Sequence, residues 1–257
     1  MASRAGSSCA AVRVLWLALG FAGLAAGPAS AVVGPSEPGG ALAASLVMVL
    51  NRNGDAAGFC TGTVLAPTVV MTAAHCAPDG GELRIYDPDQ GPTALLPVAA
   101  VRRHPDYRTD AVRTRQRSID LALIRLAAPL PARFAPATLA DAVDGSPGSR
   151  FTLSGFGVTR EGDGRSSGRL RSTTVAAQLP ASAVLLWAGD PDHKGRGACT
   201  GDSGAPLTRP GTTAVAAIAI WAAGTGAQRC GALTQGLWIA PERAWIDDAL
   251  RAWAAGR

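Results

Sequence analysis

The sequence predicts an all-β protein made of two consecutive β units, each about 110 residues long, followed by one C-terminal α-helix. Three observations lead to this prediction. Short apolar or alternating runs recur between turn signals along most of the chain. Glycine and proline contribute 31 and 18 of the 257 residues, which favours frequent turns over long helices. A helical repeat of apolar side chains occurs only near the C-terminus.

The predicted strands are apolar or alternating runs bounded by turn-forming residues. In the first unit they are Leu46–Leu50, Phe59–Leu65, Thr68–Thr72, Leu83–Tyr86 and Leu121–Leu126. A Pro/Gly-rich break at Asp144–Gly148 precedes the second unit. Its predicted strands are Arg150–Ser154, Leu170–Leu179, Ala205–Thr208, Thr213–Trp221 and Leu233–Ile239. We therefore expect one β unit over residues 32–140 and the other over 141–257.

The last segment of the chain has the signals of a helix. Pro241 suits a first helical turn, and the carboxylate of Glu242 favours the positive end of the helix dipole. Apolar side chains then recur at the spacing i, i+3, i+4 and i+7 of one helical face, at Ile246, Ala249, Leu250 and Trp253. We expect this amphipathic helix to close the second unit.

Residues 1–31 have the three-part organisation of a secretory signal peptide. Met1–Arg13 is basic and lacks acidic residues, Val14–Ala26 is apolar or small, and Ala29-Ser30-Ala31 gives a small-x-small cleavage pattern. The apolar part is too short to cross a hydrocarbon core of about 30 Å. The sequence thus predicts cleavage after Ala31, a secreted or periplasmic protein, and no membrane attachment after the signal is removed.

Composition and charge exclude several classes of protein. A hydrophobic content of 47% is incompatible with a wholly disordered chain. The body of the chain has no run of about 18 apolar residues, which excludes a polytopic membrane protein. The formal net charge is +5 and falls to +3 without Arg4 and Arg13 of the leader. Such a weak excess does not indicate nucleic-acid binding.

Four cysteines remain once the leader is set aside: Cys60, Cys76, Cys199 and Cys230. An even number in an exported chain indicates two disulfides, for which three pairings are possible. No CxxC pair occurs and the chain has three histidines, so a structural zinc site is not expected. The acidic residues at 82, 87 and 89 lack the regular spacing of a calcium loop. We expect neither a metal nor a cofactor.

Three separated segments carry candidate catalytic side chains. His75 lies in Thr-Ala-Ala-His-Cys after an apolar run, Asp120 precedes the apolar strand Leu121–Leu126, and Ser203 lies in Gly-Asp-Ser-Gly. A serine becomes a nucleophile when an adjacent base takes its proton, and that base needs a partner to fix its tautomer. Each segment alone is compatible with a surface histidine, a strand-end acid or a tight turn. The three together, in an exported chain with paired cysteines, predict nucleophilic hydrolysis.

These segments resemble the signature blocks of secreted trypsin/chymotrypsin-type serine proteases, in a bacterial-type form. The similarity extends from Val32 to the terminal helix and includes TAAHC, DLALIRL and GDSGxP, as well as CTGTV at 60–64 and SGFG at 154–157. The resemblance implies two antiparallel six-stranded β-barrels with a C-terminal helix. It also implies a monomeric endopeptidase that cleaves proteins or peptides through an acyl-enzyme.

The resemblance also implies roles for individual residues. His75 would be the general base, Asp120 would orient it, and Ser203 would attack the scissile carbonyl. The backbone N–H groups of Gly201 and Ser203 would form the oxyanion hole. The implied disulfides are Cys60–Cys76 and Cys199–Cys230. Ile220 replaces a serine that in the family helps to hold the catalytic carboxylate, so we expect Asp120 to depend more on backbone donors and on His75.

The substrate pocket implied by the resemblance is small-walled and neutral. Gly197 occupies the floor position, where an aspartate would select arginine or lysine. The flanking wall positions Ala198, Ala222 and Gly236 are all small, and Trp221, next to Ala222, also belongs to the expected pocket. An uncharged slot predicts that the residue before the cleaved bond, P1, is apolar rather than basic.

The resemblance further implies how activity is switched on. The α-ammonium of a new N-terminus at Val32 would enter the protein and pair with Asp202, beside the nucleophile. Because Val32 directly follows the predicted signal-peptidase site, export itself would create this terminus.

Two other hypotheses stay open at the level of sequence. The chain could be a catalytically weak or dead protease homologue that acts as a binding protein, although the intact triad and Gly201 argue against this. It could also be a secreted β-rich binding domain unrelated to hydrolysis. That hypothesis leaves the coincidence of the three blocks unexplained.

Overall fold

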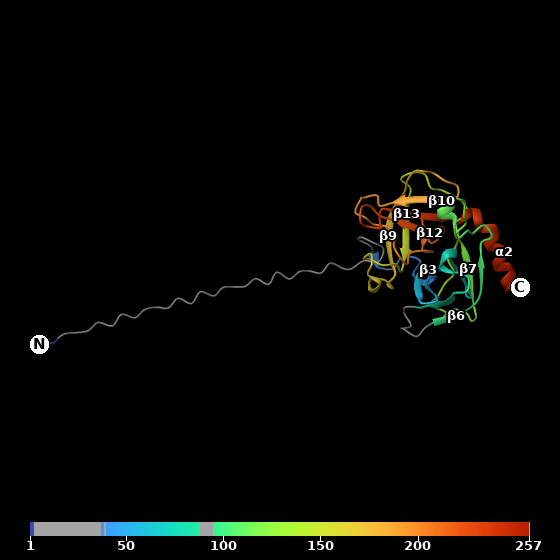
Figure 1. The fold of residues 1–257 in the computed structure, drawn as a ribbon, viewed down its shortest axis with the longest axis horizontal. Helices are drawn as coiled ribbons and strands as arrows, with labels where there is room; N and C mark the ends of the chain where they lie inside the picture. Colours follow the sequence, from blue (N-terminus) through green and yellow to red (C-terminus); the bar gives the residue numbers. More distant parts are fainter. Residues whose placement is uncertain (3–36, 39, 88–94, 257) are drawn as a thin grey trace.

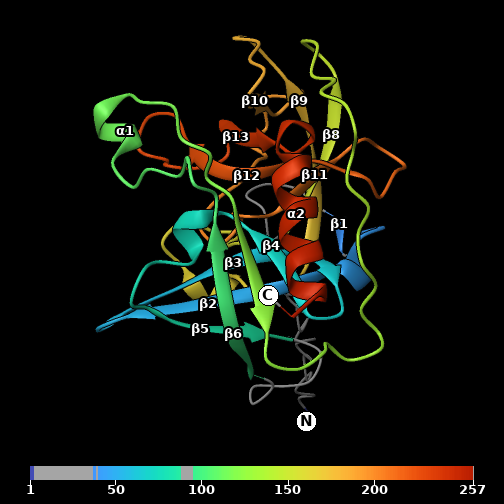
Figure 2. The same cartoon turned by 90° about the vertical axis from the view of Figure 1, so that its right-hand side faces the viewer.

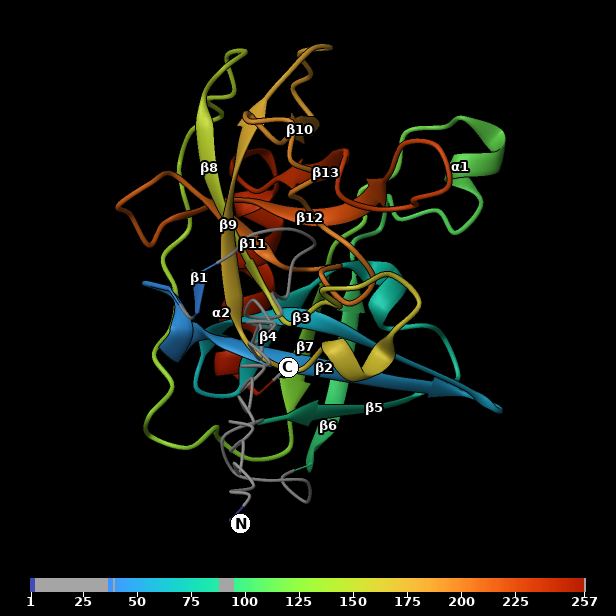
Figure 3. The same ribbon diagram turned by 90° about the vertical axis from the view of Figure 1, so that its left-hand side faces the viewer.

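Two closed antiparallel β-barrels and a C-terminal helix make up the computed structural model, which describes residues 1–2, 37–38, 40–87 and 95–256 (Figure 1). The barrels lie one above the other in the two side views (Figures 2 and 3). Nearly all of the predicted leader, together with Val32, lies outside the described residues. Within the described ranges, no helix is both long enough and apolar enough to cross a membrane.

The first barrel closes in the order β2-β3-β4-β7-β6-β5. Its strands are β2 (Leu46–Asn53), β3 (Ala56–Ala66), β4 (Val69–Thr72), β5 (Glu82–Tyr86), β6 (Leu95–Arg103) and β7 (Ala122–Leu126). The five strands predicted for this unit are all present. The strand that the sequence pattern did not predict is β6, which contains Pro97, a residue without a backbone N–H for the ladder.

The second barrel also has six strands and closes through the pairing of β9 with β8. Its strands are β8 (Arg150–Gly155), β9 (Arg171–Ala177), β10 (Leu185–Gly189), β11 (Pro206–Thr208), β12 (Val215–Ala223) and β13 (Leu233–Trp238). A short N-terminal strand, β1 (Glu37–Pro38), adds to β9. The predicted class, two six-stranded barrels with a C-terminal helix, is confirmed. The missed strand is β10, which has five residues and ends at Gly189.

Helical segments are short except at the C-terminus. Those in the described chain are η1 (Ala43–Ser45), η2 (Ala74–Cys76), α1 (Ala111–Thr114), η4 (Gly164–Ser166), η5 (Ala240–Glu242) and α2 (Arg243–Ala254). The predicted terminal helix is therefore present, although Pro241 and Glu242 form a 3-10 turn immediately before it. Both disulfides implied by the resemblance, Cys60–Cys76 and Cys199–Cys230, are formed.

The first half of β2 is apolar on both faces, and both faces are buried. On β2, Val47 and Val49 belong to the cluster that fills the first barrel. Leu46 and Met48, which alternate with them, belong to a second cluster that also contains Ile218 of β12 and Ile246 of α2. Side chains alternate between the two faces of a strand, so one strand supplies both cores. The second cluster joins the two barrels.

The helix α2 fastens the end of the chain to the first barrel. It runs beside β7 (Figure 2) and contacts it. The guanidinium groups of Arg102 on β6 and Arg125 on β7 lie 5.4 and 5.7 Å from the ring centroid of Trp253. Such cation–π contacts add to the apolar packing of the helix.

A buried polar pair joins the same two parts of the molecule. The Nε2 atom of His104 lies 3.1 Å from Oε2 of Glu242, and both side chains are 9% exposed. The backbone N–H of Asp106 donates to His104 Nδ1 at 3.1 Å. Because Nδ1 accepts this bond, the Nε2 proton of His104 is donated to Glu242. The Trp245 ring of α2 lies 5.0 Å from the imidazole, centroid to centroid.

Replacing Glu242 by alanine should lower the free energy of unfolding by about 2–4 kcal/mol, since it leaves a buried imidazole donor without an acceptor. Urea unfolding at neutral pH measures this loss. Glu82→Ala is the matched control, because Glu82 is 43% exposed and pairs with Arg52 and Arg84 at the surface. That control should cost less than about 1 kcal/mol. Equal losses for the two variants would contradict a structural role for the buried pair.

Candidate active site

Two neighbouring strands of the first barrel bring His75 and Asp120 together. His75 lies in η2, just after β4, and Asp120 lies just before β7. In the β4–β7 ladder, Thr72 at the end of β4 is paired with Ala122 at the start of β7. The segments that carry His75 and Asp120 therefore lie at the same end of the barrel. His75 Nδ1 lies 2.7 Å from Oδ2 of Asp120. Because a carboxylate only accepts hydrogen bonds, Nδ1 carries a proton, and in the neutral imidazole Nε2 keeps a lone pair for another group.

The carboxylate of Asp120 is held from two sides by the same histidine. Besides the imidazole, the backbone N–H of His75 donates to Oδ1 at 3.0 Å. In the described structure this carboxylate has one backbone donor and the imidazole, both from His75. The Asp120 side chain is 15% exposed. Its charge also acts on Tyr107, whose pKa is raised to about 12 by burial and, secondarily, by Asp120.

The loop that carries Ser203 lies against the His75 segment, although it comes from the second barrel. The Sγ atom of Cys76, the residue after His75, is 3.9 Å from the carbonyl oxygen of Ser203. At Gly204 a Cβ atom would lie 3.1 Å from the backbone nitrogen of Ala73, two residues before His75. The structure thus brings the three predicted segments to one place, where the two barrels meet.

A tight turn precedes Ser203 and orients the backbone of Gly201. The turn is closed by the Asp202 N–H, which donates to the carbonyl of Cys199 at 3.0 Å. Gly201 has φ +94°, and a Cβ there would lie 2.0 Å from the Phe59 ring, so only glycine fits. Neither the Gly201 nor the Ser203 N–H has an acceptor within the described part of the chain. Both donors are available to a ligand.

The direction of the Gly201 N–H follows from its peptide group. The N–H of Val158 donates to the carbonyl of Thr200 at 2.9 Å. In a trans peptide the C=O and the next N–H point in opposite directions. The Gly201 N–H therefore points away from Val158. The bond from Val158 to Thr200 thus restrains the orientation of the Gly201 N–H.

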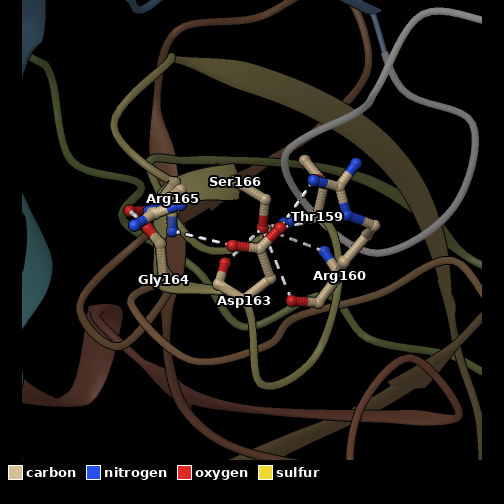
Figure 4. A network of polar contacts seen from close by, with 7 residues as sticks. Thr159, Arg160, Asp163, Gly164, Arg165 and Ser166 are labelled. Atoms are coloured by element: carbon tan, nitrogen blue, oxygen red, sulfur yellow. Dashed lines mark hydrogen bonds and ion pairs between the residues drawn. The ribbon is translucent and has the colours of Figure 1, made fainter.

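The segment that follows Val158 has its own polar network (Figure 4). The Asp163 carboxylate accepts from the guanidinium of Arg160 at 2.5 and 3.1 Å and from the backbone N–H of Arg165 at 3.1 Å. The hydroxyl of Ser166 accepts from the N–H of Thr159 at 3.1 Å and donates to the carbonyl of Asp163 at 2.6 Å. These bonds give a defined shape to the loop beside the Gly201 turn.

Asp202 is a fully buried carboxylate. Its oxygens accept from the N–H groups of Gly157 and Cys199, each at 2.9 Å. A Cβ at Gly155 or Gly157 would lie 2.3 or 2.4 Å from this carboxyl group, which explains two glycines of the SGFG block. Burial raises the pKa of Asp202 to about 7. Val32, its expected partner, lies outside the described residues.

The structure places the predicted pocket residues in two different environments. Gly197 and Ala198 lie against Thr234: a Cβ at Gly197 would be 3.1 Å from Thr234 Oγ1, which accepts the Ala198 N–H at 2.9 Å. A Cβ at Gly236 would instead meet Leu207 and Ala217 in the core of the second barrel. Thr234 was missed from the sequence; it is paired with Ala222 in the β12–β13 ladder.

The other expected wall residues lie on β12. Trp221 is 49% exposed, and Ala222 is partly buried. The nearby acids do not add a free carboxylate to this region: Asp190 accepts from the Arg196 guanidinium at 3.1 Å, and Asp192 pairs with the same arginine. Backbone donors and Arg196 outweigh the burial of Asp190 and lower its pKa to about 2.

The described chain contains one cluster of potential metal ligands, Cys60, His75 and Cys76. Both cysteines are joined in a disulfide and offer no thiolate. The cluster therefore does not suit a metal ion.

Comparisons with known proteins agree with this geometry. The trypsin family model matches residues 34–237. A trypsin of Saccharopolyspora erythraea is 31% identical over 168 residues, 58% of this chain and 70% of the relative. Alkaline C trypsin of Manduca sexta is 32% identical over 238 residues, 80% of this chain and 87% of the relative.

The fold is shared with solved structures. Neuropsin, a serine protease expressed in the limbic system of mouse brain, superimposes with a TM-score of 0.62 at 24% identity, over 79% of this chain and 93% of neuropsin. The match to the trypsin family model, which spans both barrels, and the identity to alkaline C trypsin show that the chain belongs to the trypsin family of serine endopeptidases.

Proposed function

We propose that the protein is a secreted endopeptidase that works through Ser203, His75 and Asp120. The observation that carries this proposal is the 2.7 Å bond between His75 Nδ1 and Asp120 Oδ2, next to the Ser203 loop. The hydroxyl of Ser203 attacks the scissile carbonyl carbon, and His75 Nε2 takes its proton. The N–H groups of Gly201 and Ser203 stabilise the oxyanion. His75 then protonates the leaving amine, and water hydrolyses the acyl-enzyme.

Export is part of the same proposal. The basic, apolar and small-residue pattern of residues 1–31 supports it. Two disulfides support it independently, since such bonds persist in oxidising compartments.

Specificity for an uncharged P1 side chain follows from the residues around Gly197. No carboxylate lies at the floor position, and the acids at 190 and 192 are paired with Arg196. A buried cationic P1 side chain would be left without a partner, which is costly. The flanking positions Ala198 and Ala222 are small, which leaves room for a bulky side chain. We propose a large apolar or aromatic P1 residue.

Activation by the amine of Val32 is supported by the surroundings of Asp202. Its carboxylate has two backbone donors and no cation among the described residues. The described chain resumes at Glu37, in β1, which pairs with β9 next to β8. Five residues span up to about 17 Å. Asp202 lies against Gly155 at the end of β8, and β8 is two inter-strand spacings from β1, which is about 10 Å. The amine of Val32 is therefore within reach of Asp202.

Ser203→Ala should leave the protein folded and exported while peptide hydrolysis falls by several orders of magnitude. Because the triad acts as a unit, adding His75→Ala should cost little more. Steady-state hydrolysis of a peptide substrate and covalent labelling by a fluorophosphonate probe measure both effects. A double variant far slower than either single variant would contradict the assignment, as would labelling of Ser203→Ala.

Cleavage of a random peptide library should show apolar P1 residues, favoured over arginine and lysine by at least roughly tenfold in kcat/KM. Gly197→Asp should shift cleavage toward basic P1 residues, because it places a carboxylate at the floor. Gly197→Asn is the matched control, since it adds a side chain of the same size and shape without charge and should not cause the shift. Preferential cleavage by the unaltered enzyme after arginine or lysine would refute the neutral pocket.

A chain with Gly-Ser added before Val32 should be nearly inactive, because its amine cannot reach Asp202. In the extended chain the raised pKa of Asp202 contributes to the free energy of unfolding. This contribution is complete below about pH 4 and is lost as the pH rises through about 7. Urea unfolding between pH 4 and 8 measures this loss. Asp202→Asn in the extended chain should remove that part of the slope. Equal activity of the extended and processed chains, with the extension intact by mass spectrometry, would rule the mechanism out.

A further inference from the structure

Thr61, on β3 of the first barrel, holds the nucleophile loop of the second barrel at several atoms. Its backbone N–H donates to the carbonyl of Ser203 at 2.8 Å. Its hydroxyl donates to the carbonyl of Gly201 at 3.0 Å. A Cβ at Gly204 would lie 2.2 Å from the Thr61 carbonyl oxygen, so the two backbones are in close contact. The Thr61 side chain is fully buried.

Two hydrogen bonds fix the orientation of the Thr61 hydroxyl. It also accepts a hydrogen bond from the N–H of Phe156 at 3.1 Å. One hydroxyl therefore joins β3 to two segments of the second barrel, and its single proton is committed to the Gly201 carbonyl.

Gly201 needs such external bonds because glycine has little backbone preference of its own. The peptide before it is held by the bond from Val158 to the Thr200 carbonyl, at 2.9 Å. The peptide after it is held by the Thr61 hydroxyl. With both flanking peptides fixed, the direction of the Gly201 N–H is fixed as well. Without the Thr61 bond, the second peptide would be held only by the Asp202 N–H, which donates to the Cys199 carbonyl at 3.0 Å, so the direction of the Gly201 N–H would be less tightly fixed.

We infer that Thr61 is a positioning residue for the oxyanion hole, which acts through the carbonyl of Gly201. This inference rests on the proposed function, since it assigns to Gly201 the stabilisation of the transition state. The residue does not contact the reacting atoms. Its removal should therefore weaken binding of the transition state and leave binding of the ground state unchanged.

The chain offers a matched control on the same strand. Thr63 lies two residues after Thr61 and so faces the same side of β3. It is also fully buried, but its hydroxyl has no hydrogen-bond partner in the described structure. Replacing Thr63 by valine removes a hydroxyl of the same kind without breaking a bond.

The experiment compares four variants of the processed enzyme, which begins at Val32. They are Thr61→Val, Thr61→Ser, Thr63→Val and Ser203→Ala. Two inhibitors of one sequence are used, a peptide boronic acid, which forms a tetrahedral adduct with the serine, and the corresponding peptide amide, which does not. In Thr61→Val we expect kcat to fall roughly 10- to 100-fold with KM little changed. The Ki of the boronic acid should rise by a similar factor, while the Ki of the amide stays constant. Thr61→Ser and Thr63→Val should behave as the unaltered enzyme.

The inference is overturned if folded Thr61→Val keeps both kcat and the boronic acid Ki of the unaltered enzyme. It is also overturned if Thr63→Val shows the same loss, or if the loss lies in KM and in amide binding, because those results indicate a general structural effect. Where Thr61→Val does not fold, Thr61→Ala is measured against the same outcomes. Activity retained by Ser203→Ala would instead refute the proposed function, so the two failures are distinguishable.

Discussion

The backbone of residues 199–204 is the constraint on which the rest of the site depends. This loop has no helix or strand of its own, and hydrogen bonds from both barrels determine its shape. Val158 and Thr61 fix the two peptides around Gly201, and the N–H of Gly204 donates to the carbonyl of Ala219 at 2.6 Å. Glycine at 201 and 204 permits the positive φ values that the loop requires, but it does not enforce them.

The two barrels contribute different halves of the site, so their relative position has chemical consequences. His75 and Asp120 are held by adjacent strands of the first barrel, whereas Ser203 belongs to the second. The apolar cluster between the barrels, to which the helix α2 contributes Ile246 and Ala249, fixes the position of one half relative to the other. The His104–Glu242 pair adds a polar link between the first barrel and the start of that helix. Packing far from the proposed catalytic side chains thus determines how they meet.

Three aspartates illustrate how the surroundings of a carboxylate set its role. Asp120 takes two hydrogen bonds from His75 and stays partly exposed. Asp190 takes several backbone bonds and the Arg196 guanidinium, so its pKa is low and its charge is already compensated. Asp202 is fully buried with two backbone donors, and burial raises its pKa. Of the three, only Asp202 has surroundings that favour an additional cation.

The amino-acid sequence was sufficient to predict the fold class, most of the strands, and the three segments that bear His75, Asp120 and Ser203. These features depend on local chemistry, namely side-chain periodicity, turn-forming residues and short motifs. Only the tertiary structure identified Thr61 and Thr234 as partners of Gly201 and Ala198, and only it placed Gly236 in a barrel core. These contacts join residues that are 140 and 36 positions apart. No spacing along the chain predicts such contacts, because the closure and docking of the two barrels bring the partners together.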